Sequence, residues 1–431
     1  MSTIGIIAEF NPFHNGHSHL IEECKKITGA DNCIVIMSGD FVQRGAPALT
    51  DKFTRARMAL SCGADLVLEL PVYYSTGSAE YFARGAVSIL DKIGAVDYLC
   101  FGSELGDISL MDAIADILNN EPKVYRDILA KELKKGSSFA AARDKALTET
   151  IKTHADVEST KLAKTGVSIK SIKSAIASPN NILAIEYLRA LKMLKSKMKP
   201  ITIQREGAEY NSEKLSAIPS ALSIRNLLAK APISHGCLAS ASRKKLMTQL
   251  KDSIPKEALS ILFSDDIRYV KSDDFSSLLK YKLVSERFTG YEAYLDVTED
   301  ISNKIIKNLD SFDTFEDFCM KIKSKDITYS RISRCLIHIL LNIRKDNMQE
   351  YTSDSYTGYV RILGQKASAK KLLSKIQDSS SIPVLNRLKD APHKLSGLQM
   401  KLFEETLNAS SIYNLATGNS TNEYRLKPVI M

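Results

Sequence analysis

The sequence predicts an α/β fold in which a doubly wound parallel sheet is followed by a mainly helical region. Strand and helix patterns alternate through the N-terminal quarter, whereas from about Ile233 the pattern is helical and has no internal repeat. The expected strands are Ile4–Phe10, Cys33–Met37, Ala64–Leu70 and Tyr98–Phe101. The expected helices between them are Ser18–Thr28, Asp51–Cys62 and Ser78–Ile93.

Polar or glycine-bearing segments follow three of the expected strands. They are the histidine turn after Phe10, Ser38-Gly39-Asp40, and Phe101-Gly102-Ser103-Glu104. In a doubly wound sheet the ligand crevice lies beyond the carboxyl ends of the strands. We therefore expect these three segments to meet at one crevice.

The histidine turn, His14-Asn15-Gly16-His17, opens the first helix directly after the first strand. Two imidazoles beside the unpaired amides of a helix N-terminus suit the phosphates of a nucleoside triphosphate. Gly16 lets the backbone approach a phosphate closely, and His14 and His17 can donate to phosphate oxygens as charge builds up at the α-phosphorus. The alternative is two surface histidines in a turn, but the strand-to-helix context favours the nucleotide site, with His19 as a bystander.

The composition is that of a large protein with two or three domains. The chain has 431 residues, 44% of them hydrophobic, and no apolar run reaches the roughly 18 residues that a membrane span needs. The N-terminus has no signal-peptide pattern, so we expect a cytoplasmic protein without a membrane partner. The seven cysteines form no Cys-x-x-Cys pair and no metal-ligand spacing, which indicates buried, reduced thiols and no protein-held metal.

Charge is distributed unevenly along the chain. Through Asp107 there are 8 basic and 13 acidic residues, a net charge of −5, so that the overall net charge of +9 leaves +14 for the remaining residues. A basic excess of this size favours solubility and is also the footprint of a nucleic-acid-binding surface. By itself it favours a nucleic-acid partner only slightly.

The segment between Asp107 and Ser178 is helical and charged in pattern, which indicates an insertion or a lid. Apolar residues at helical spacing after Pro179-Asn180-Asn181 predict a buried amphipathic helix that begins at an Asn cap. A strand, Pro200–Gln204, follows and ends in Arg205-Glu206.

The next expected helix opens with Pro219-Ser220-Ala221-Leu222-Ser223-Ile224-Arg225. A serine-rich helix start that ends in arginine can bind the β and γ phosphates through amides, hydroxyls and a guanidinium. We therefore include Ser223 and Arg225 among the expected nucleotide contacts. The alternative is an ordinary helix cap followed by a surface arginine.

Several of these motifs resemble those of known enzymes. His14-Asn15-Gly16-His17 and Ser223-Ile224-Arg225 resemble the paired signatures of the nucleotidyltransferase superfamily that includes pantetheine-phosphate adenylyltransferase. More closely, nearly the full chain resembles the bacterial tRNA(Met) cytidine acetate ligase family. The segments that carry this resemblance are Gly5–His17, Met37–Gly45, Ser178–Leu183, Tyr329–Arg334 and Tyr359–Gly364.

The resemblance implies a Rossmann-like nucleotidyltransferase domain at residues 1–232, with a helical insertion at about 108–178, and a helical, basic tRNA-binding domain at residues 233–431. It implies that ATP activates acetate to acetyl-adenylate and that the wobble cytidine of elongator tRNA(Met) is then acetylated to N(4)-acetylcytidine. A triphosphate site usually brings Mg²⁺ as well. The implied ATP contacts are Ile7, Ala8, Glu9, Phe10, Asn11, Pro12, Phe13, His14, Asn15, Gly16, His17, Ser18, His19, Leu20, Gly102, Asn180, Arg205 and Glu206.

Asp40 and Arg44 lie in a polar loop that glycines bound at a strand end. In one hypothesis Asp40 is catalytic and accepts a hydrogen bond from the cytidine amine, while Arg44 holds acetate or phosphate at the RNA-binding edge. The alternative is an ion pair that only orders the loop. Three basic residues on the following helix could contact RNA or form a solvated face, and the solvated face is favoured for each of them: Lys52, Arg55 and Arg57.

The expected RNA contacts of the C-terminal half are Arg331, Arg334 and Arg361, each near tyrosines that could stack on bases. Arg331 and Arg334 are three residues apart and therefore share a helical face. The alternative is that the tyrosines belong to the core and the arginines are solvated.

The sequence leaves two other functions open. A nucleotidyltransferase could release pyrophosphate while it acts on a small phosphorylated acceptor, although the extra basic half argues against so small an acceptor. A non-catalytic RNA-binding protein would need no intact histidine turn. The metal requirement, the oligomeric state and the acyl group are not determined by the residues.

Overall fold

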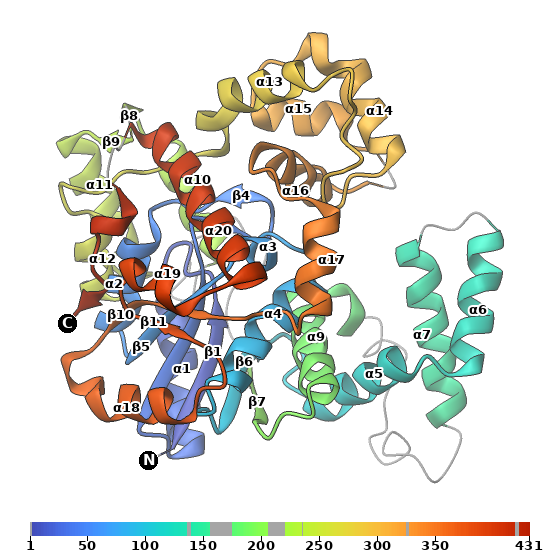
Figure 1. Ribbon diagram of the computed structural model, residues 1–431, viewed down its shortest axis with the longest axis horizontal. Helices are drawn as coiled ribbons and strands as arrows, with labels where there is room; N and C mark the ends of the chain where they lie inside the picture. Colours follow the sequence, from blue (N-terminus) through green and yellow to red (C-terminus); the bar gives the residue numbers. More distant parts are fainter. Residues whose placement is uncertain are drawn as a thin grey trace.

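The chain folds around a mixed sheet that is surrounded by helices. The computed structural model describes residues 2–135, 139–155, 175–205, 220–234, 236–324, 327–418 and 422–431. The strand order is β11-β10-β5-β2-β1-β6-β7, with β12 paired to β10 (Figure 1). The strands of this sheet are β1 (Thr3–Ala8), β2 (Asn32–Ser38), β5 (Leu66–Leu70), β6 (Tyr98–Ser103), β7 (Lys199–Gln204), β10 (Val360–Gln365), β11 (Val384–Leu385) and β12 (Val429–Ile430). Two short hairpins consist of β3 (Phe41–Val42) with β4 (Ala46–Pro47) and β8 (Ile233–Ser234) with β9 (Cys237–Leu238).

Helices surround this sheet. They are α1 (Asn15–Thr28), α2 (Lys52–Ser61), α3 (Val72–Ser75), α4 (Ala79–Lys92), α5 (Ile108–Asn120), α6 (Lys123–Lys134), α7 (Phe139–Ala155), α9 (Pro179–Met193), α10 (Ala221–Ala229), α11 (Ser240–Leu250), α12 (Lys256–Leu262), α13 (Ser276–Ser285), α14 (Glu299–Asn308), α15 (Phe315–Ile322), α16 (Tyr329–Leu340), α17 (Lys345–Ser353), α18 (Lys370–Ser379), α19 (Ala391–Lys394) and α20 (Gly397–Thr417). Short 3-10 turns are η1 (Ser272–Phe275), η2 (Leu309–Ser311), η3 (Ala367–Ala369), η4 (Leu388–Asp390) and η5 (Glu423–Arg425). Within the described ranges, every helix is too short or too polar to span a lipid bilayer.

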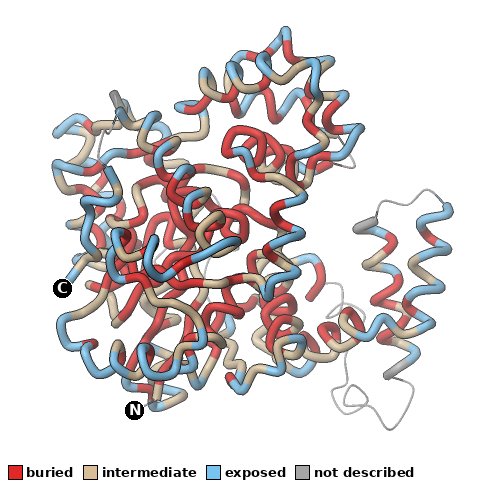
Figure 2. The backbone as a smooth tube through the Cα atoms, viewed as in Figure 1, coloured by how far each residue is buried: buried red, intermediate tan, exposed pale blue. Residues whose placement is uncertain are grey.

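Five neighbouring strands, in the order β5-β2-β1-β6-β7, are parallel. The chain moves from β1 outward to β2 and β5, and then returns to β6 and β7 on the other side of β1. Separate hydrophobic clusters hold α1 and α2 on one face and α4 and α9 on the other, and the buried positions are concentrated along these elements (Figure 2). The predicted doubly wound α/β fold is therefore confirmed. Its ligand crevice lies where the strand order reverses, between the carboxyl ends of β1 and β6.

Side-chain caps determine where the helices begin. Asp51 accepts hydrogen bonds from the backbone N of Phe53 and Thr54, both at 2.9 Å, and so begins α2. The predicted Asn cap of α9 is wrong, because this helix is capped at Ser178 and has Pro179 in its first turn.

Glu104, which follows β6, takes the place of a local cap for α9. Its carboxylate accepts hydrogen bonds from the backbone N of Asn181 at 2.9 Å and from Asn180 Nδ2 at 2.7 Å. A carboxylate at a helix N-terminus is favoured by the helix dipole. The start of α9 is thereby fixed to the carboxyl end of β6, beside the crevice.

The expected helical insertion consists of α5, α6 and α7 over residues 108–155, and Figure 1 shows α6 and α7 lying well to one side of the sheet. Helix α5 packs against α9, while α6 and α7 pack mainly against each other. The later part of the expected insertion, residues 156–174, lies outside the described residues.

The expected helical region beyond residue 233 also supplies strands to the sheet. Strand β10 runs antiparallel to β5, and β11 and β12 run parallel to β10. The sequence did not predict these strands, because Val360–Gln365 is a short apolar run whose pairing depends on a distant edge strand. The C-terminal part of the chain is therefore built into the same sheet as the N-terminal part.

The cysteines are all free thiols, as the sequence predicted. Five of them are buried, whereas Cys62 and Cys237 are only partly buried. Burial raises the pKa of the Cys33 and Cys319 thiols to about 12, so that these groups stay protonated.

A buried cluster of charged side chains connects β10 and the C-terminal tail to the rest of the sheet. Lys52 Nζ lies 2.7 Å from Glu69 Oε1 and 2.5 Å from Glu423 Oε1. Arg361 lies 2.9 Å from Glu69 and 3.0 Å from Glu423. Burial disfavours both cations, but the two carboxylates outweigh it and raise the pKa of Lys52 and of Arg361.

This cluster overturns two interpretations of the basic residues. Arg361 is not an RNA contact, because its side chain is 4% exposed and is paired with two carboxylates. Lys52 and Arg55 do not form a solvated face, because both are buried, whereas Arg57 keeps part of its side chain in solvent. The sequence could not show this, since the partners of Lys52 are distant along the chain.

We expect Arg361→Met to lower the free energy of unfolding by about 3–5 kcal/mol, because it removes the charge, keeps most of the volume, and leaves Glu69 and Glu423 short of a partner. Urea unfolding measures this. Arg387→Ala is the control, because Arg387 pairs with Asp390 at the surface and should contribute about 0–1 kcal/mol. Equal losses in the two variants, with reduced RNA affinity only in Arg361→Met, would contradict this account.

Candidate functional site

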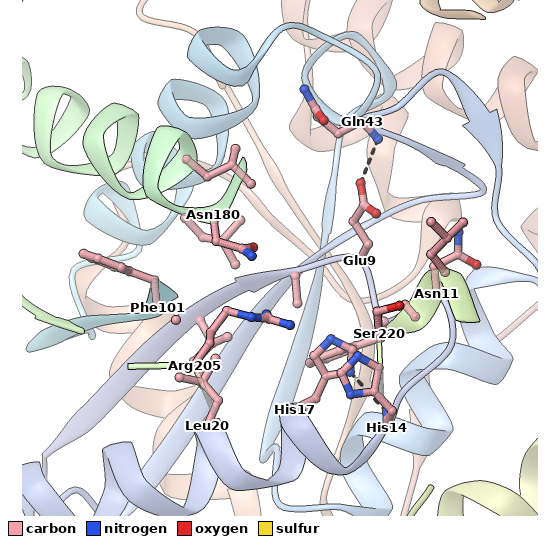
Figure 3. Close-up of a pocket in the computed structure, with 18 of the residues that line it drawn as sticks. Glu9, Asn11, His14, His17, Leu20, Gln43, Phe101, Asn180, Arg205 and Ser220 are labelled. Carbon is pink, nitrogen blue, oxygen red and sulfur yellow. Dashed lines mark hydrogen bonds between the residues drawn. The ribbon is translucent and has the colours of Figure 1, made fainter. Parts of the chain in front are cut away.

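A pocket lies at the reversal point of the sheet, and segments from several elements line it (Figure 3). The lining comes from β1 and the turn after it, α1, α4, β6, α9, α10, the β3–β4 turn and Arg205 after β7. The residues expected at the nucleotide site that line it are Ile7, Ala8, Glu9, Phe10, Asn11, His14, His17, Leu20, Gly102, Asn180, Arg205 and Arg225. The geometry thus brings together segments that lie far apart in the sequence.

The two histidines of the turn are held by backbone amides. His14 caps α1, and its Nδ1 accepts a hydrogen bond from Gly16 N at 3.1 Å. Nδ1 of His17 accepts a hydrogen bond from His14 N at 3.2 Å, and the two rings stack with centroids 3.7 Å apart. Because Nδ1 of each neutral ring is an acceptor, the ring proton is on Nε2. Each Nε2–H can therefore donate a hydrogen bond to a ligand.

The surroundings keep these imidazoles neutral. Burial, together with the nearby charges of Arg205 and Arg225, lowers the pKa of His14 to about 3. Burial, His14 and Arg205 lower the pKa of His17 as well. At neutral pH the histidines are therefore uncharged donors, and the two arginines supply the positive charge of the site.

Arg205 and Arg225 reach the pocket from two different elements, the end of β7 and the first turns of α10. Arg205 follows β7, and Figure 3 shows its guanidinium extending toward the imidazoles. A side chain at Gly102 would place its Cβ 3.3 Å from Arg205 Cγ, so the glycine makes room for the arginine. Arg225 Nη1 donates to the carbonyl of Asn11 at 2.7 Å, which ties α10 to the histidine turn.

Ser220, rather than Ser223, supplies the hydroxyl at the start of α10. Ser223 is buried, and its hydroxyl donates to the carbonyl of Ser220 at 2.8 Å. Ser220 lines the pocket and accepts a hydrogen bond from Ser223 N at 3.1 Å. The expected contact through Ser223 is therefore wrong, because the helix begins at Ser220 and turns Ser223 toward the core.

Other residues of the histidine turn support the pocket without lining it. Phe13 is buried and its ring packs against His17, with centroids 5.4 Å apart. Asn15 binds the turn before α12, through its backbone N to the carbonyl of Ser253 at 3.1 Å. The remaining expected contacts that do not line the pocket are Pro12, Gly16, Ser18 and His19. Glu206 lies outside the described residues.

Asp40 does not reach the pocket. Its carboxylate accepts a hydrogen bond from Lys52 N at 2.9 Å and lies 3.7 Å from Lys52 Nζ. Burial raises the pKa of Asp40, and the charge of Lys52 opposes this effect. The proposed hydrogen bond from the cytidine amine to Asp40 does not fit this geometry. Asp40 instead orders its loop, with Lys52 as the partner.

A second cavity of about 890 Å³ lies beside the pocket, which the sequence did not predict. It runs between α10, the β3–β4 hairpin and the start of α16. The two cavities share wall residues: Glu9, Asn11, Arg44, Leu222 and Arg225. We call the second cavity the groove. The groove therefore lies directly beside the nucleotide-side pocket, and these residues border both cavities.

The β3–β4 hairpin is fixed against α16 at Gly45. This glycine has φ +73°, and a Cβ there would overlap the backbone of Ser333 and Arg334. Ser333 Oγ donates to the carbonyl of Gly45 at 2.6 Å. The close contact places Arg44 between the two cavities.

Arg331 and Arg334 of α16 were expected to contact RNA beside tyrosines that stack on bases, and their surroundings differ from this expectation. Arg334 Nε lies 3.0 Å from Asp296 Oδ2, so this arginine is part of an ion pair. Arg331 is half-buried on the first turn of the helix. The tyrosines are mostly core residues, because Tyr359 and Tyr351 are 2% exposed, while Tyr329 lines the groove.

The fold and site define a nucleotidyltransferase of the HIGH class. A model of the family described as HIGH Nucleotidyl Transferase matches residues 1–427. The match includes the strand, histidine turn and helix that carry His14 and His17, and it continues past β10 and β11 to residue 427.

Individual relatives narrow the class to one family. A tRNA(Met) cytidine acetate ligase of Clostridium perfringens is 38% identical over 436 residues, which cover 100% of both chains, and one of Acetivibrio thermocellus is 38% identical over 97% of this chain and 96% of its own. The apo structure of Thermotoga maritima TmcAL superimposes on this chain with a TM-score of 0.88, at 27% identity over 100% of both chains. The structure of Thermotoga maritima TmcAL bound with alpha-thio ATP superimposes with a TM-score of 0.86, at 27% identity over 100% of this chain and 99% of the TmcAL chain. The chain belongs to the tRNA(Met) cytidine acetate ligase family and is a ligase.

We expect the His14 imidazole of the ligand-free protein to show no protonation between pH 8 and pH 5, because burial holds its pKa at about 3. In the unfolded chain the pKa is about 6.5, so the unfolded state binds the proton more tightly and the stability of the fold decreases as the pH falls below 6.5. NMR of the imidazole Cε1 proton measures the titration. The His14→Asn variant, which keeps a cap, assigns the resonance by its absence. A midpoint near 6.5 would contradict the buried, neutral state.

We expect Gly45→Ala to lower the free energy of unfolding by about 3 kcal/mol, because the hairpin that carries Arg44 must move away from α16. Gly29→Ala is the matched control. Gly29 also has a positive φ, of +64°, but nothing lies within 4 Å of its added Cβ, so only backbone strain of about 1 kcal/mol is expected. Urea unfolding measures the difference between the two variants. Equal effects would show that the contact at Gly45 is loose.

Proposed function

We propose that this protein uses ATP to activate acetate to acetyl-adenylate and then acetylates the wobble cytidine of elongator tRNA(Met), giving N(4)-acetylcytidine. The observation that carries the proposal is the pocket at the strand reversal, where two Nε2–H donors and two arginines converge beside a groove large enough for a nucleoside. Family membership supports the same reaction. Because the acceptor is tRNA, we place this activity in the cytoplasm.

The first half-reaction fits the charges of the pocket. An oxygen of acetate attacks the α-phosphorus, the bond from that phosphorus to the bridging oxygen of pyrophosphate breaks, and pyrophosphate leaves with the electron pair. His14 and His17 donate to the α-phosphate oxygens, and Arg205 neutralises the negative charge that spreads over them. Ser220 and Arg225, at the start of α10, bind the leaving pyrophosphate. The apolar side chains of Leu20 and Phe101 hold the adenine end.

Mg²⁺ would enter with the triphosphate rather than on a protein cage. Among the described residues, no group of three or more His, Cys, Asp or Glu side chains is arranged to hold a metal ion. Among the residues of the pocket wall that the structure describes, Glu9 supplies the one carboxylate, whereas Mg²⁺ prefers several oxygen ligands in octahedral geometry. We therefore assign the ion to the phosphates and derive no step through it.

We place acetate beside Arg44, at the boundary between the pocket and the groove. A guanidinium can bind a carboxylate through two parallel hydrogen bonds. From this position the attacking oxygen faces the nucleotide, and the methyl group faces the apolar wall that Leu222 contributes to both cavities. The acetyl group would then lie at the opening of the groove when the acetyl-adenylate has formed.

We assign the groove to the anticodon loop of the tRNA. Proteins recognise RNA sequences mostly in single-stranded loops, whose bases can be turned out and stacked on aromatic side chains. Tyr329 lines the groove, and Lys271 and Lys323 at its wall can contact phosphates. Arg331 lies on the same helix as Tyr329 and extends this basic edge.

The proposal is tested by incubating the protein with ATP, labelled acetate and total tRNA, and by following pyrophosphate release and label in isolated nucleosides. Label in N(4)-acetylcytidine, reduced at least about 100-fold in His17→Ala, is the expected result, because the variant loses a donor to the reacting phosphate.

Lys26→Ala is the matched control for this experiment, because Lys26 lies on the same helix with 76% of its side chain exposed. It should keep wild-type activity. Pyrophosphate release without label in RNA would instead indicate a small-molecule nucleotidyltransferase, and no ATP turnover would indicate a non-catalytic RNA-binding protein.

A further inference from the structure

The second half-reaction needs a proton acceptor next to the acetyl group. The exocyclic amine of cytidine is a weak nucleophile, since its lone pair is delocalised into the ring. When its nitrogen bonds to the acetyl carbon, it becomes cationic and acidic, and the intermediate collapses to product only after the proton is lost. A carboxylate within hydrogen-bond reach of the amine is sufficient for this transfer.

The histidines of the pocket are unsuited to this role. Nδ1 of His14 and Nδ1 of His17 already accept backbone hydrogen bonds, and each Nε2 carries the ring proton. The low pKa of His14, about 3, also makes it a poor base. Asp40, the acceptor that the sequence suggested, is turned away toward Lys52.

Glu9 is the carboxylate at the boundary of the two cavities. Among the described residues that line the pocket it is the sole acidic side chain, and it lines the groove as well. It directly follows β1, and Figure 3 shows its carboxylate turned away from the imidazoles toward Gln43. Its position therefore faces the acceptor side of the site.

The carboxylate of Glu9 is held by one oxygen. Oε1 accepts a hydrogen bond from Gln43 N at 2.8 Å, and the backbone carbonyl of Glu9 accepts one from Arg55 Nη1 at 2.7 Å. Within the described part of the chain, no side chain or amide donates a hydrogen bond to Oε2. One oxygen thus fixes the orientation, and the other is available to a ligand.

We propose that Glu9 is a catalytic residue whose Oε2 accepts the proton from the N4 amine of a cytidine that the groove delivers. The N4 nitrogen bonds to the acetyl carbon, the bond from that carbon to the phosphate oxygen breaks, AMP leaves with the electron pair, and the N4 proton passes to Glu9 and then to water. This assignment rests on the proposed function. It adds the base and the side from which the acceptor enters.

The shared wall of the two cavities fits this arrangement. Arg44 and Arg225 line both cavities, so that they lie between the α-phosphate on one side and the RNA on the other. Their charges favour the AMP leaving group and the phosphate backbone of the loop. The nucleoside would therefore meet the acetyl group beside Glu9, on the face opposite to the imidazoles.

Glu9→Gln separates the two half-reactions, because the amide oxygen can still accept from Gln43 N while the base is lost. Acetate-dependent exchange of pyrophosphate into ATP measures the first half-reaction, and single-turnover transfer of acetyl from preformed acetyl-adenylate to tRNA measures the second. We expect exchange to stay within about 3-fold of wild type and acetyl transfer to decrease at least about 100-fold. The residual transfer should rise about tenfold per pH unit, because hydroxide then removes the proton.

Two further variants complete the test. Glu9→Asp keeps a shorter carboxylate and should restore part of the transfer with the pH dependence of the wild type. Glu22→Gln, the same substitution at an exposed position of α1, should leave both half-reactions unchanged.

Equal losses of exchange and transfer in both Glu9 variants would overturn the proposal, because Glu9 would then act on ATP or its metal ion, or only support the fold. Unchanged transfer in Glu9→Gln would also overturn it. Failure of the proposed function is seen separately, as wild-type protein that exchanges pyrophosphate but never labels tRNA.

Discussion

The buried guanidinium of Arg55 fixes the part of the molecule from which the site is built. Its Nη1 donates to the carbonyls of Glu9 at 2.7 Å and Ser38 at 3.0 Å, and its Nε donates to the carbonyl of Thr50 at 3.1 Å. Burial lowers the pKa of this group, and the nearby carboxylate of Asp40 opposes that effect. One planar cation thus joins the carboxyl ends of β1 and β2, where strand geometry alone would leave the carbonyls without partners. The position of the histidine turn and of Glu9 depends on it.

The C-terminal region also contributes strands and charged side chains to the sheet that carries the site. Glu423 and Arg361 complete the charges around Lys52, and β10 extends the sheet beside β5. On the other side of the site, Ser333 holds the hairpin at Gly45. A buried ion cluster of this kind stabilises the fold only when every member is present. The nucleotide-binding sheet and the helical region are therefore interdependent, and the groove between them exists because both are in place.

The site divides its chemistry between neutral donors and fixed charges. His14 and His17 are kept uncharged, so that they do not repel Arg205 and, in the proposed reaction, act on phosphate oxygens through hydrogen bonds. The charge is carried by arginines, which stay protonated when buried. In the reaction that we propose, the two sides of the site differ in function: phosphoryl chemistry lies beside the imidazoles, and acyl transfer lies beside Glu9. Both proposed steps use the one crevice that lies where the strand order reverses.

The sequence by itself determined the features that are local. A strand, a turn and a helix that follow one another predicted the histidine site, and the strand-end rule placed Gly102 at the same crevice. The same rule failed for Ser38-Gly39-Asp40, which does not line the pocket, and Arg205 was expected there only from the family resemblance. It also determined the doubly wound fold, because alternation is read directly from apolar periodicity. Tertiary structure decided the partners of single side chains: Asp40 and Arg361 are paired within a buried cluster, and Glu104 rather than an asparagine caps α9. The reason is physical. A side chain's partner depends on which distant segment packs beside it, and no local pattern encodes that choice.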